Sequence, residues 1–321
     1  MTVIPYYLRR VTRTRRAAAS AAAGALLWGT LGPVAALIGP GDRVAAGGIR
    51  LAIGALVLFA VAKGRPLRSR WTRADLGPLV GGAVGIAGFQ VAYFGAIGSA
   101  GVAVSTAVGI GLSPVFTGLW TAVKNRRRPG AGWSVGTATA VGGLCLLAFA
   151  NGAGTTFSLA GLGLSVLAAA FFSGQAVSIQ ALTARHGDAT ALTGILALGA
   201  LLMAPVIAVT ATGNLLTPQG VSGVAYLGVV TTGMSYWLFA RGIRHIGAAA
   251  AVTITLLEPA AAAVIAAVAL HEQLTAGQWA GIVMIGAAIT ITGRTAKAPE
   301  ADACGGPAEA EELVTPGHGQ G

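Results

Sequence analysis

Ten apolar segments recur along the chain, each about as long as a helix that crosses a lipid bilayer. They cover residues 17–37, 44–62, 76–98, 102–123, 131–150, 158–181, 189–211, 221–240, 247–270 and 274–293. A hydrocarbon core requires about 20 apolar residues in a helix, and within it every backbone polar group must be bonded internally. The sequence therefore predicts an all-α polytopic membrane protein with ten transmembrane helices, and the lipid bilayer is its first partner.

The composition excludes several other classes of protein. Of the 321 residues, 55% are hydrophobic and only 10% are charged, whereas about 25% of a soluble domain is charged. The net charge of +11 does not indicate nucleic-acid binding, because the basic residues lie between apolar segments and not on one face of a soluble domain. The two cysteines and four histidines are scattered, and no nucleophile or phosphate-loop pattern is present. We expect no metal, no cofactor and no enzymatic activity.

Basic residues indicate which way the helices point. If the N-terminus is cytoplasmic, all but two of the 21 Lys and Arg residues fall on the cytoplasmic side, the exceptions being Arg43 and Arg50. Such asymmetry is what the positive-inside tendency predicts for short loops. We expect a plasma (inner) membrane protein whose basic N-terminus (1–16) and disordered, Gly-, Pro- and acid-rich tail (294–321) are both cytoplasmic.

The two halves of the chain, residues 17–150 and 158–293, echo each other. In each half an aromatic pair, Tyr93-Phe94 or Tyr236-Trp237, leads through a glycine turn to a helix with a central proline. Pro114 follows Gly101 by 13 residues, and Pro259 follows Gly247 by 12. Because each half has an odd number of spans, the sequence predicts two inverted five-helix repeats.

The two prolines are expected to break their helices near the middle of the membrane. At about 1.5 Å per residue they lie roughly 16–18 Å from the start of each helix. Each proline should free one carbonyl, that of Ile110 or Thr255. Broken helices at the midplane of an inverted repeat indicate a transporter's substrate site, although the prolines could instead be simple kinks that the duplication copied.

These motifs resemble the drug/metabolite transporter (DMT) superfamily, and in particular a pair of EamA domains, over residues 20–293. The resemblance rests on Trp28-Gly29-Thr30, on Arg50, on "YFGAI" leading to "LSPVFTGL", and on "YLGVVTTGMSYWLFARGI" leading to "LLEPAAAAVIAAVALHEQLTAGQWAGIVMIGAAI". It implies a ten-helix exporter or importer of small metabolites. The sequence departs from the family in "KNRRRPG" after the fourth segment, where the family often has a Gly-Glu pair.

Glu258 is the carboxylate that lies well inside a span, and an ionisable group at that depth is a functional candidate. One hypothesis is that Glu258 takes up and releases a proton as a coupling ion. The alternative is structural: Glu258 pairs with Arg50 or caps the backbone that Pro259 frees. Arg50 is either an interfacial anchor that snorkels to the headgroups or a cavity residue suited to a carboxylate-bearing solute.

Thr231, Thr232 and Ser235 are further polar residues that could line a pathway or serve only helix packing. The sequence favours a secondary active transporter that moves a small metabolite, amino-acid-like or otherwise polar or amphipathic, outward by alternating access. The alternatives are a membrane-embedded enzyme or a scaffold subunit. The substrate and coupling candidates are Glu258, Pro259, Pro114, Arg50, Tyr93, Tyr236, Trp28, Gln90 and Thr255.

Overall fold

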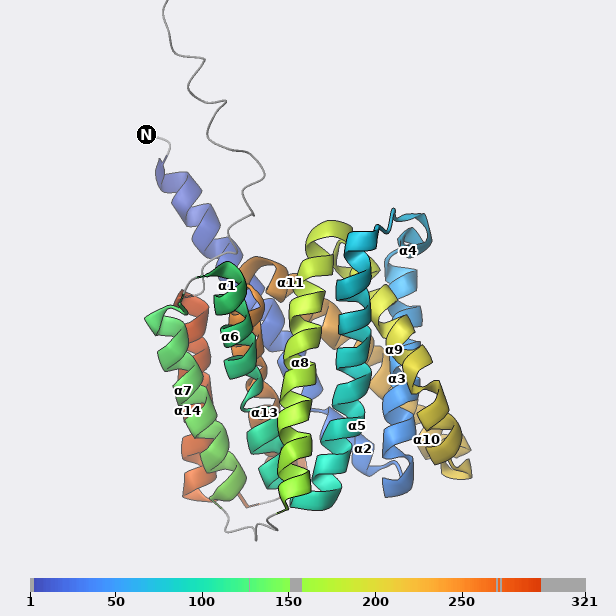
Figure 1. Cartoon of the computed structure of the whole chain (residues 1–321). Coiled ribbons are helices and arrows are strands. Elements are labelled where there is room, and N and C mark those ends of the chain that lie inside the picture. Colours follow the sequence, from blue (N-terminus) through green and yellow to red (C-terminus); the bar gives the residue numbers. More distant parts are fainter. Residues whose placement is uncertain (1–2, 127, 151–157, 270, 272, 296–321) are drawn as a thin grey trace, which may run out of the picture.

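The computed structural model describes residues 3–126, 128–150, 158–269, 271 and 273–295, and within these ranges it contains helices and no strands (Figure 1). The tail from residue 296 onward, where disorder is expected, lies outside the described residues. In chain order the elements are α1 (Val3–Trp28), α2 (Leu31–Ala36), η1 (Pro40–Asp42), α3 (Arg43–Val61), α4 (Arg65–Arg68), α5 (Arg73–Gly109), α6 (Ser113–Asn125), α7 (Ala131–Phe149), α8 (Leu159–His186), α9 (Asp188–Thr210), η2 (Gly213–Leu216), α10 (Pro218–Tyr226), η3 (Leu227–Met234), α11 (Ser235–Ile246), α12 (Ala248–Thr255), α13 (Leu257–Ala269) and α14 (Ala276–Thr295).

Nine helices of the described chain are long and apolar enough to cross a membrane, and one of them, α5, doubles back on itself. The hydroxyl groups of Tyr93 and Thr106 are 2.8 Å apart. Thirteen residues of straight helix would separate these positions by about 20 Å. The chain therefore reverses between them, at Gly101, so α5 supplies the third crossing and, continued by α6, the fourth. This confirms the break expected there and brings the number of crossings to ten.

Three glycines make reversals that no other residue adopts without strain. Gly101, Gly187 and Gly247 have φ of 77°, 78° and 82° with ψ of 167°, 166° and 160°. This region of backbone space is nearly restricted to glycine. Gly101 and Gly247 occupy equivalent places in the two halves, as the sequence echo predicts, and each lets two helices follow one another with no connecting loop.

Two pairs of counterpart helices, α7 with α14 and α3 with α9, pack antiparallel, which is the arrangement of an inverted repeat. Along α7 and α14, Gly136 approaches Thr292 whereas Gly143 approaches Gly281, so the residue numbers run in opposite directions. Along α3 and α9, Gly48 approaches Met203 and Ile207, whereas Gly199 approaches Leu51. At these contacts a Cβ on glycine would meet its neighbour closely, so the small residues let the helices approach one another.

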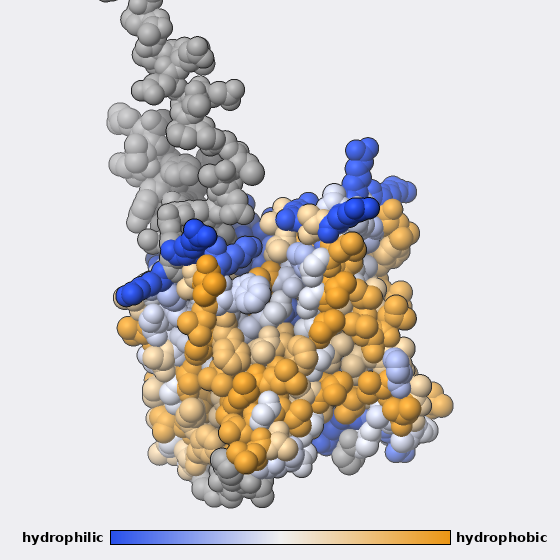
Figure 2. Space-filling model, in the orientation of Figure 1, coloured by the Kyte–Doolittle hydropathy of each residue, from blue (hydrophilic) through white to orange (hydrophobic). Residues whose placement is uncertain are grey.

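The surface divides into one basic end and an apolar belt (Figure 2). We call the end with most Lys and Arg the basic face, and the other end, which holds Asp42 and Arg43, the far face. Between them large apolar side chains are exposed, including Leu56 (69%), Val209 (83%) and Val283 (67%). Exposed apolar area on this scale is suited to contact with lipid chains and not with water.

Three local features differ from the sequence-based expectation. The first helix begins at Val3 and not near residue 17, because apolarity marks where a helix meets lipid and not where the helix begins. Its crossing is interrupted at Gly29 and Thr30, where a Cβ on Gly29 would lie 2.6 Å from the Cβ of Ala261. The eighth crossing contains a π-helical segment, η3, which no apolar pattern reveals.

Substituting Gly101 by alanine should destabilise the protein, although the methyl group of the alanine would have room. Nothing lies within 4 Å of a Cβ at Gly101, so the expected cost of about 1–3 kcal/mol comes from the backbone conformation alone. Gly98, three residues earlier, is the matched control, since it is helical and its Cβ would also meet nothing. Thermal unfolding in detergent should show a lower midpoint for Gly101→Ala and none of that loss for Gly98→Ala; equal midpoints would contradict the assigned turn.

Candidate functional site

Two helices are interrupted in mid-span, each just before a proline. In the first half α5 ends at Gly109 and α6 begins at Ser113, with Pro114 second in the new helix. In the second half α12 ends at Thr255 and α13 begins at Leu257, with Pro259 third. Proline fits the first turn of a helix because the backbone N–H is not needed there. The predicted breaks in the fourth and ninth crossings are therefore confirmed, and each proline starts a second half-helix.

The two interruptions meet inside the protein. Ile110, from the first break, and Leu256, from the second, pack in one buried cluster with Leu144 of α7 and Ile285 of α14. The last helices of both repeats thus support both breaks from one side. The remaining side of each break faces the other helices of the bundle.

The prediction of a free carbonyl at Ile110 is wrong. The Ile110 carbonyl accepts from the Ser113 N–H at 3.2 Å, which closes the break with a tighter turn. The Ser113 hydroxyl donates to the Gly109 carbonyl at 2.8 Å, and Ser173 of α8 donates to the Ser113 carbonyl at 2.9 Å. Short polar side chains satisfy this backbone. On the second break, the buried Thr255 hydroxyl donates to the Val252 carbonyl at 2.7 Å.

Glu258 lies in the first turn of α13 and is partly accessible. No described residue donates a hydrogen bond to its carboxylate or forms an ion pair with it within 4 Å. Neither structural alternative, pairing with Arg50 or capping the freed backbone, therefore describes this conformation. The second break delivers a carboxylate without a protein partner to the interior.

Arg50 faces that carboxylate from α3. Its side chain is 6% exposed and its Nη1 donates to the Thr232 hydroxyl at 2.9 Å, so it does not snorkel to the membrane surface. Arg50 and Glu258 attract one another across the interior, and Tyr236 lies within the reach of both charges. Some buried side-chain atoms of the described residues are fully enclosed and lack a hydrogen-bond partner. No atom of Arg50 or Glu258 is among them. The carboxylate of Glu258 and the remaining nitrogens of Arg50 are therefore not fully enclosed by the protein.

The π-helical segment η3 presents the partner of Arg50. Thr231 and Thr232 both donate to the Leu227 carbonyl, at 2.7 and 2.9 Å, and Ser235 donates to the Val230 carbonyl at 3.1 Å. Thr231 and Ser235 therefore serve the backbone, whereas the Thr232 oxygen also accepts from Arg50. π-Helical turns occur frequently at functional sites.

A chain of aromatic rings lies beside the two charges and joins both halves of the protein. Neighbouring ring centroids are 4.9 Å apart for Trp28 and Tyr236 and 6.4 Å apart for Trp28 and Phe172. They are 5.4 Å apart for Phe172 and Phe89 and 5.2 Å apart for Phe89 and Tyr93. The predicted residues Trp28, Tyr93 and Tyr236 are thus brought together.

The other predicted residues lie near the charges or at the breaks. Gln90 donates to the Gly47 carbonyl at 3.2 Å, one helical turn before Arg50. Pro114, Pro259 and Thr255 shape the breaks and stand outside the ring chain.

Sequence reasoning missed Phe89, Phe172 and Gln175. The Gln175 amide donates to the Tyr236 hydroxyl at 3.2 Å. Gln175 was detectable as an uncharged polar group inside a span. Phe89 and Phe172 carry no signal that separates them from ordinary apolar residues of a span.

Two polar ties hold the ends of the bundle together. On the far face Asp42 accepts from the N–H and the hydroxyl of Thr212, at 2.6 and 2.7 Å. On the basic face Asp75 accepts from Arg185 at 2.8 Å, and the Nε2 of His186 lies 3.2 Å from it. The far-face tie joins the connections between spans 1 and 2 and between spans 7 and 8. The basic-face tie joins their repeat counterparts, the connections between spans 6 and 7 and between spans 2 and 3.

Fold and site together define a polytopic α-helical membrane protein, an inverted repeat in whose interior a broken helix places Glu258 opposite Arg50 of α3. The EamA-like transporter family matches this chain twice, over residues 15–149 and 159–294. The chain belongs to that family, which is a family of membrane transporters.

Curated relatives and a solved structure agree with this assignment. "Uncharacterized transporter YwfM" of Bacillus subtilis (strain 168) is 31% identical over 81% of this chain and 88% of its own. "Uncharacterized inner membrane transporter YicL" of Salmonella typhimurium (strain LT2) is 26% identical over 85% of this chain and 93% of its own. A crystal structure with 19% identity has a TM-score of 0.73 over 86% of this chain and 95% of its own, which supports the fold.

The far-face tie predicts a pH-dependent contribution to stability. The hydrogen bond from the Thr212 hydroxyl lowers the pKa of Asp42 below its usual value of 3.8, and burial opposes this shift only in part. A carboxyl with a lowered pKa in the folded protein stabilises it above the unfolded pKa and loses that contribution as the pH falls through the folded pKa.

Asp42→Asn should therefore lower the thermal unfolding midpoint at pH 7, and the difference from wild type should shrink as the pH falls below about 4. Asparagine keeps the size of the side chain but removes the charge, so the comparison isolates the carboxylate. Midpoints recorded in detergent from pH 7 to pH 3 provide the measurement. A difference that stays constant over this range would contradict a charged tie.

Proposed function

We propose that this protein is a secondary active transporter that exports a small amino-acid-like solute by alternating access, with a proton as the coupling ion. The observation that carries the proposal is the unpartnered carboxylate of Glu258 facing the buried guanidinium of Arg50 within the spans. Burying charge is expensive in hydrocarbon, and charges retained there mark substrate or ion pathways.

The chemistry of the site favours a solute that carries both a cationic amine and a carboxylate. Arg50 supplies a planar fork that suits a carboxylate, and Glu258 supplies the complement of an ammonium group. Trp28 and Tyr236 offer an apolar surface with polar edges for the remainder of the molecule. A zwitterion would neutralise both charges at once, which a purely apolar or singly charged solute does not do.

Glu258 can couple the solute to a proton because the two compete for one carboxylate. While the site is open to the cytoplasm, the ionised carboxylate binds the ammonium group of the solute. Once the site opens to the other side, a proton replaces the solute on the carboxylate oxygen and is carried back. One proton therefore moves inward as one solute molecule moves outward, and the empty, ionised site is restored when the proton leaves.

The two polar ties are suited to act as the gates. Opening the basic face requires the Asp75–Arg185 tie to part while the Asp42–Thr212 tie holds, and opening the far face requires the reverse. Because the ties join equivalent connections of two inverted repeats, exchanging the conformations of the repeats exchanges the open and closed ends.

Orientation follows the basic residues. We place the basic face in the cytoplasm and the protein in the plasma (inner) membrane, with both chain ends cytoplasmic. The positive-inside tendency supports this orientation, and the relative YicL is named as an inner membrane transporter.

Glu258→Gln should abolish coupling to protons, whereas exchange should persist with weaker binding of the solute. Glutamine keeps the shape of the side chain and cannot take up a proton. In proteoliposomes supplied with a mixture of ¹⁴C-labelled amino acids, uptake driven by a pH gradient should disappear, whereas exchange of labelled for unlabelled solute at equal pH should persist. Glu258→Asp, which retains a carboxyl group, is the matched control and should keep part of the gradient-driven flux.

A Glu258→Gln protein whose uptake still responds fully to the pH gradient would overturn the coupling role. Absence of flux in wild-type vesicles with any amino acid would overturn the proposed substrate class.

Arg50→Ala should weaken solute binding without changing the amount of protein in the membrane. A hydrogen-bonded charge contributes about 1.5–3 kcal/mol, so the apparent KM for exchange should rise roughly ten- to a hundredfold. Arg50→Lys keeps the charge but not the fork and should show an intermediate rise. Arg68→Ala, an exposed arginine on the basic face, is the control and should leave KM unchanged. An unchanged KM in Arg50→Ala would exclude this residue from the solute site.

A further inference from the structure

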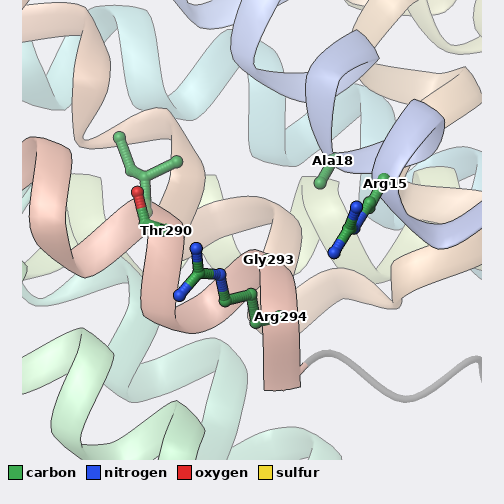
Figure 3. A pocket seen from close by; sticks show the side chains of 6 residues that line it. Arg15, Ala18, Thr290, Gly293 and Arg294 are labelled. Atoms are coloured by element: carbon green, nitrogen blue, oxygen red, sulfur yellow. The ribbon is translucent and has the colours of Figure 1, made fainter. Parts of the chain in front are cut away.

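The basic face carries a pocket between the first and the last helix. Its volume is 290 Å³, and Figure 3 shows Arg15 of α1 and Arg294 of α14 on its two sides. The residues that line it are Arg15, Ala18, Ile289, Thr290, Gly293 and Arg294. No carboxylate is among them, so the pocket has two positive charges without compensation from its own walls.

Both guanidinium groups are available for a ligand. Arg15 and Arg294 are exposed, and neither forms a hydrogen bond or ion pair with a described residue. A guanidinium fork matches the oxygens of a phosphate group, and two of them can hold one phosphate from opposite sides. The charge and geometry therefore select a phosphate-bearing anion.

Part of the pocket wall is apolar, and the stripe of α14 that lines the pocket leads on toward exposed positions of the same helix. Ala18 and Ile289 line the pocket, and one to two turns further along α14 come Gly286 and then Val283, which is 67% exposed. A Cβ on Gly286 would meet nothing within 4 Å, so a shallow path is open there. Free inorganic phosphate would use only the arginines, whereas a phospholipid would use both the arginines and this path.

We propose that this pocket binds the phosphate group of an anionic phospholipid of the adjacent leaflet, with one acyl chain along α14. A basic pocket between helices at this depth is the kind of site that anionic headgroups occupy. A zwitterionic lipid fits less well, because its own cation would lie next to Arg15 and Arg294. The bound lipid bridges the first helix of one repeat and the last helix of the other.

The test compares lipids on the purified full-length protein in a neutral detergent. Dioleoyl phosphatidylglycerol should raise the thermal unfolding midpoint of the wild type, whereas dioleoyl phosphatidylcholine and inorganic phosphate should not. The double variant Arg15→Gln/Arg294→Gln should bind phosphatidylglycerol roughly 30-fold more weakly in a lipid titration, since each arginine near anionic lipid contributes a factor of about five. Native mass spectrometry counts the lipid retained by each protein.

The matched control is Arg65→Gln/Arg68→Gln, which removes the same charge from exposed positions of the same face. It should bind phosphatidylglycerol as the wild type does. If both double variants bound phosphatidylglycerol equally weakly, the loss of binding would come from net charge alone, and this result would overturn the site. An equal response to inorganic phosphate would identify free phosphate as the occupant and overturn the lipid.

A further variant separates the acyl path from the arginines and does not depend on their effect on folding. Gly286→Leu fills the open path on α14 and leaves both arginines in place. It should also weaken phosphatidylglycerol binding, while the unfolding midpoint without lipid stays at the wild-type value. Undiminished binding in Gly286→Leu would contradict an acyl chain at this position.

Discussion

The requirement that every backbone polar group inside a membrane be bonded governs this structure. A helix can break in hydrocarbon only where the surrounding protein closes the break or where the break lines a polar space. The first break is closed by Ser113 and Ser173, and both breaks rest on one apolar cluster that includes Leu144 and Ile285. With its backbone secured in this way, the second break can carry Glu258 into the interior.

Charge is what distinguishes this interior from a plain helix bundle. Arg50 is buried and held by Thr232, and Glu258 has no hydrogen-bond or ion-pair partner among the residues that the structure describes, so the two attract one another without neutralising each other by contact. A closed ion pair would stabilise a single conformation. In the proposed mechanism, the two separated charges and the aromatic rings beside them bind the solute, and the polar ties at either end decide which side of the membrane reaches it.

Much of this architecture could be predicted from the sequence, because segment length, proline and glycine act locally. The ten crossings, the reversal at Gly101 and the paired breaks follow from such local rules, and the fold and family are confirmed. The depth of Arg50, the π-helical segment and the Phe172 ring depend on packing between distant segments, which no local pattern encodes. The carbonyl of Ile110 was mispredicted because its new donor, the N–H of Ser113, comes from the tightened turn that the break itself creates.

The most direct test of alternating access is the reactivity of position 258 from each side of the membrane. A Glu258→Cys protein lacking Cys145 and Cys304 would be treated with a membrane-impermeant thiol reagent. Asp42→Asn, which weakens the far-face tie, should raise labelling from the far face. Arg185→Gln, which weakens the basic-face tie, should raise labelling from the basic face. Labelling that is equal from both sides in both variants, or absent from both, would contradict the account.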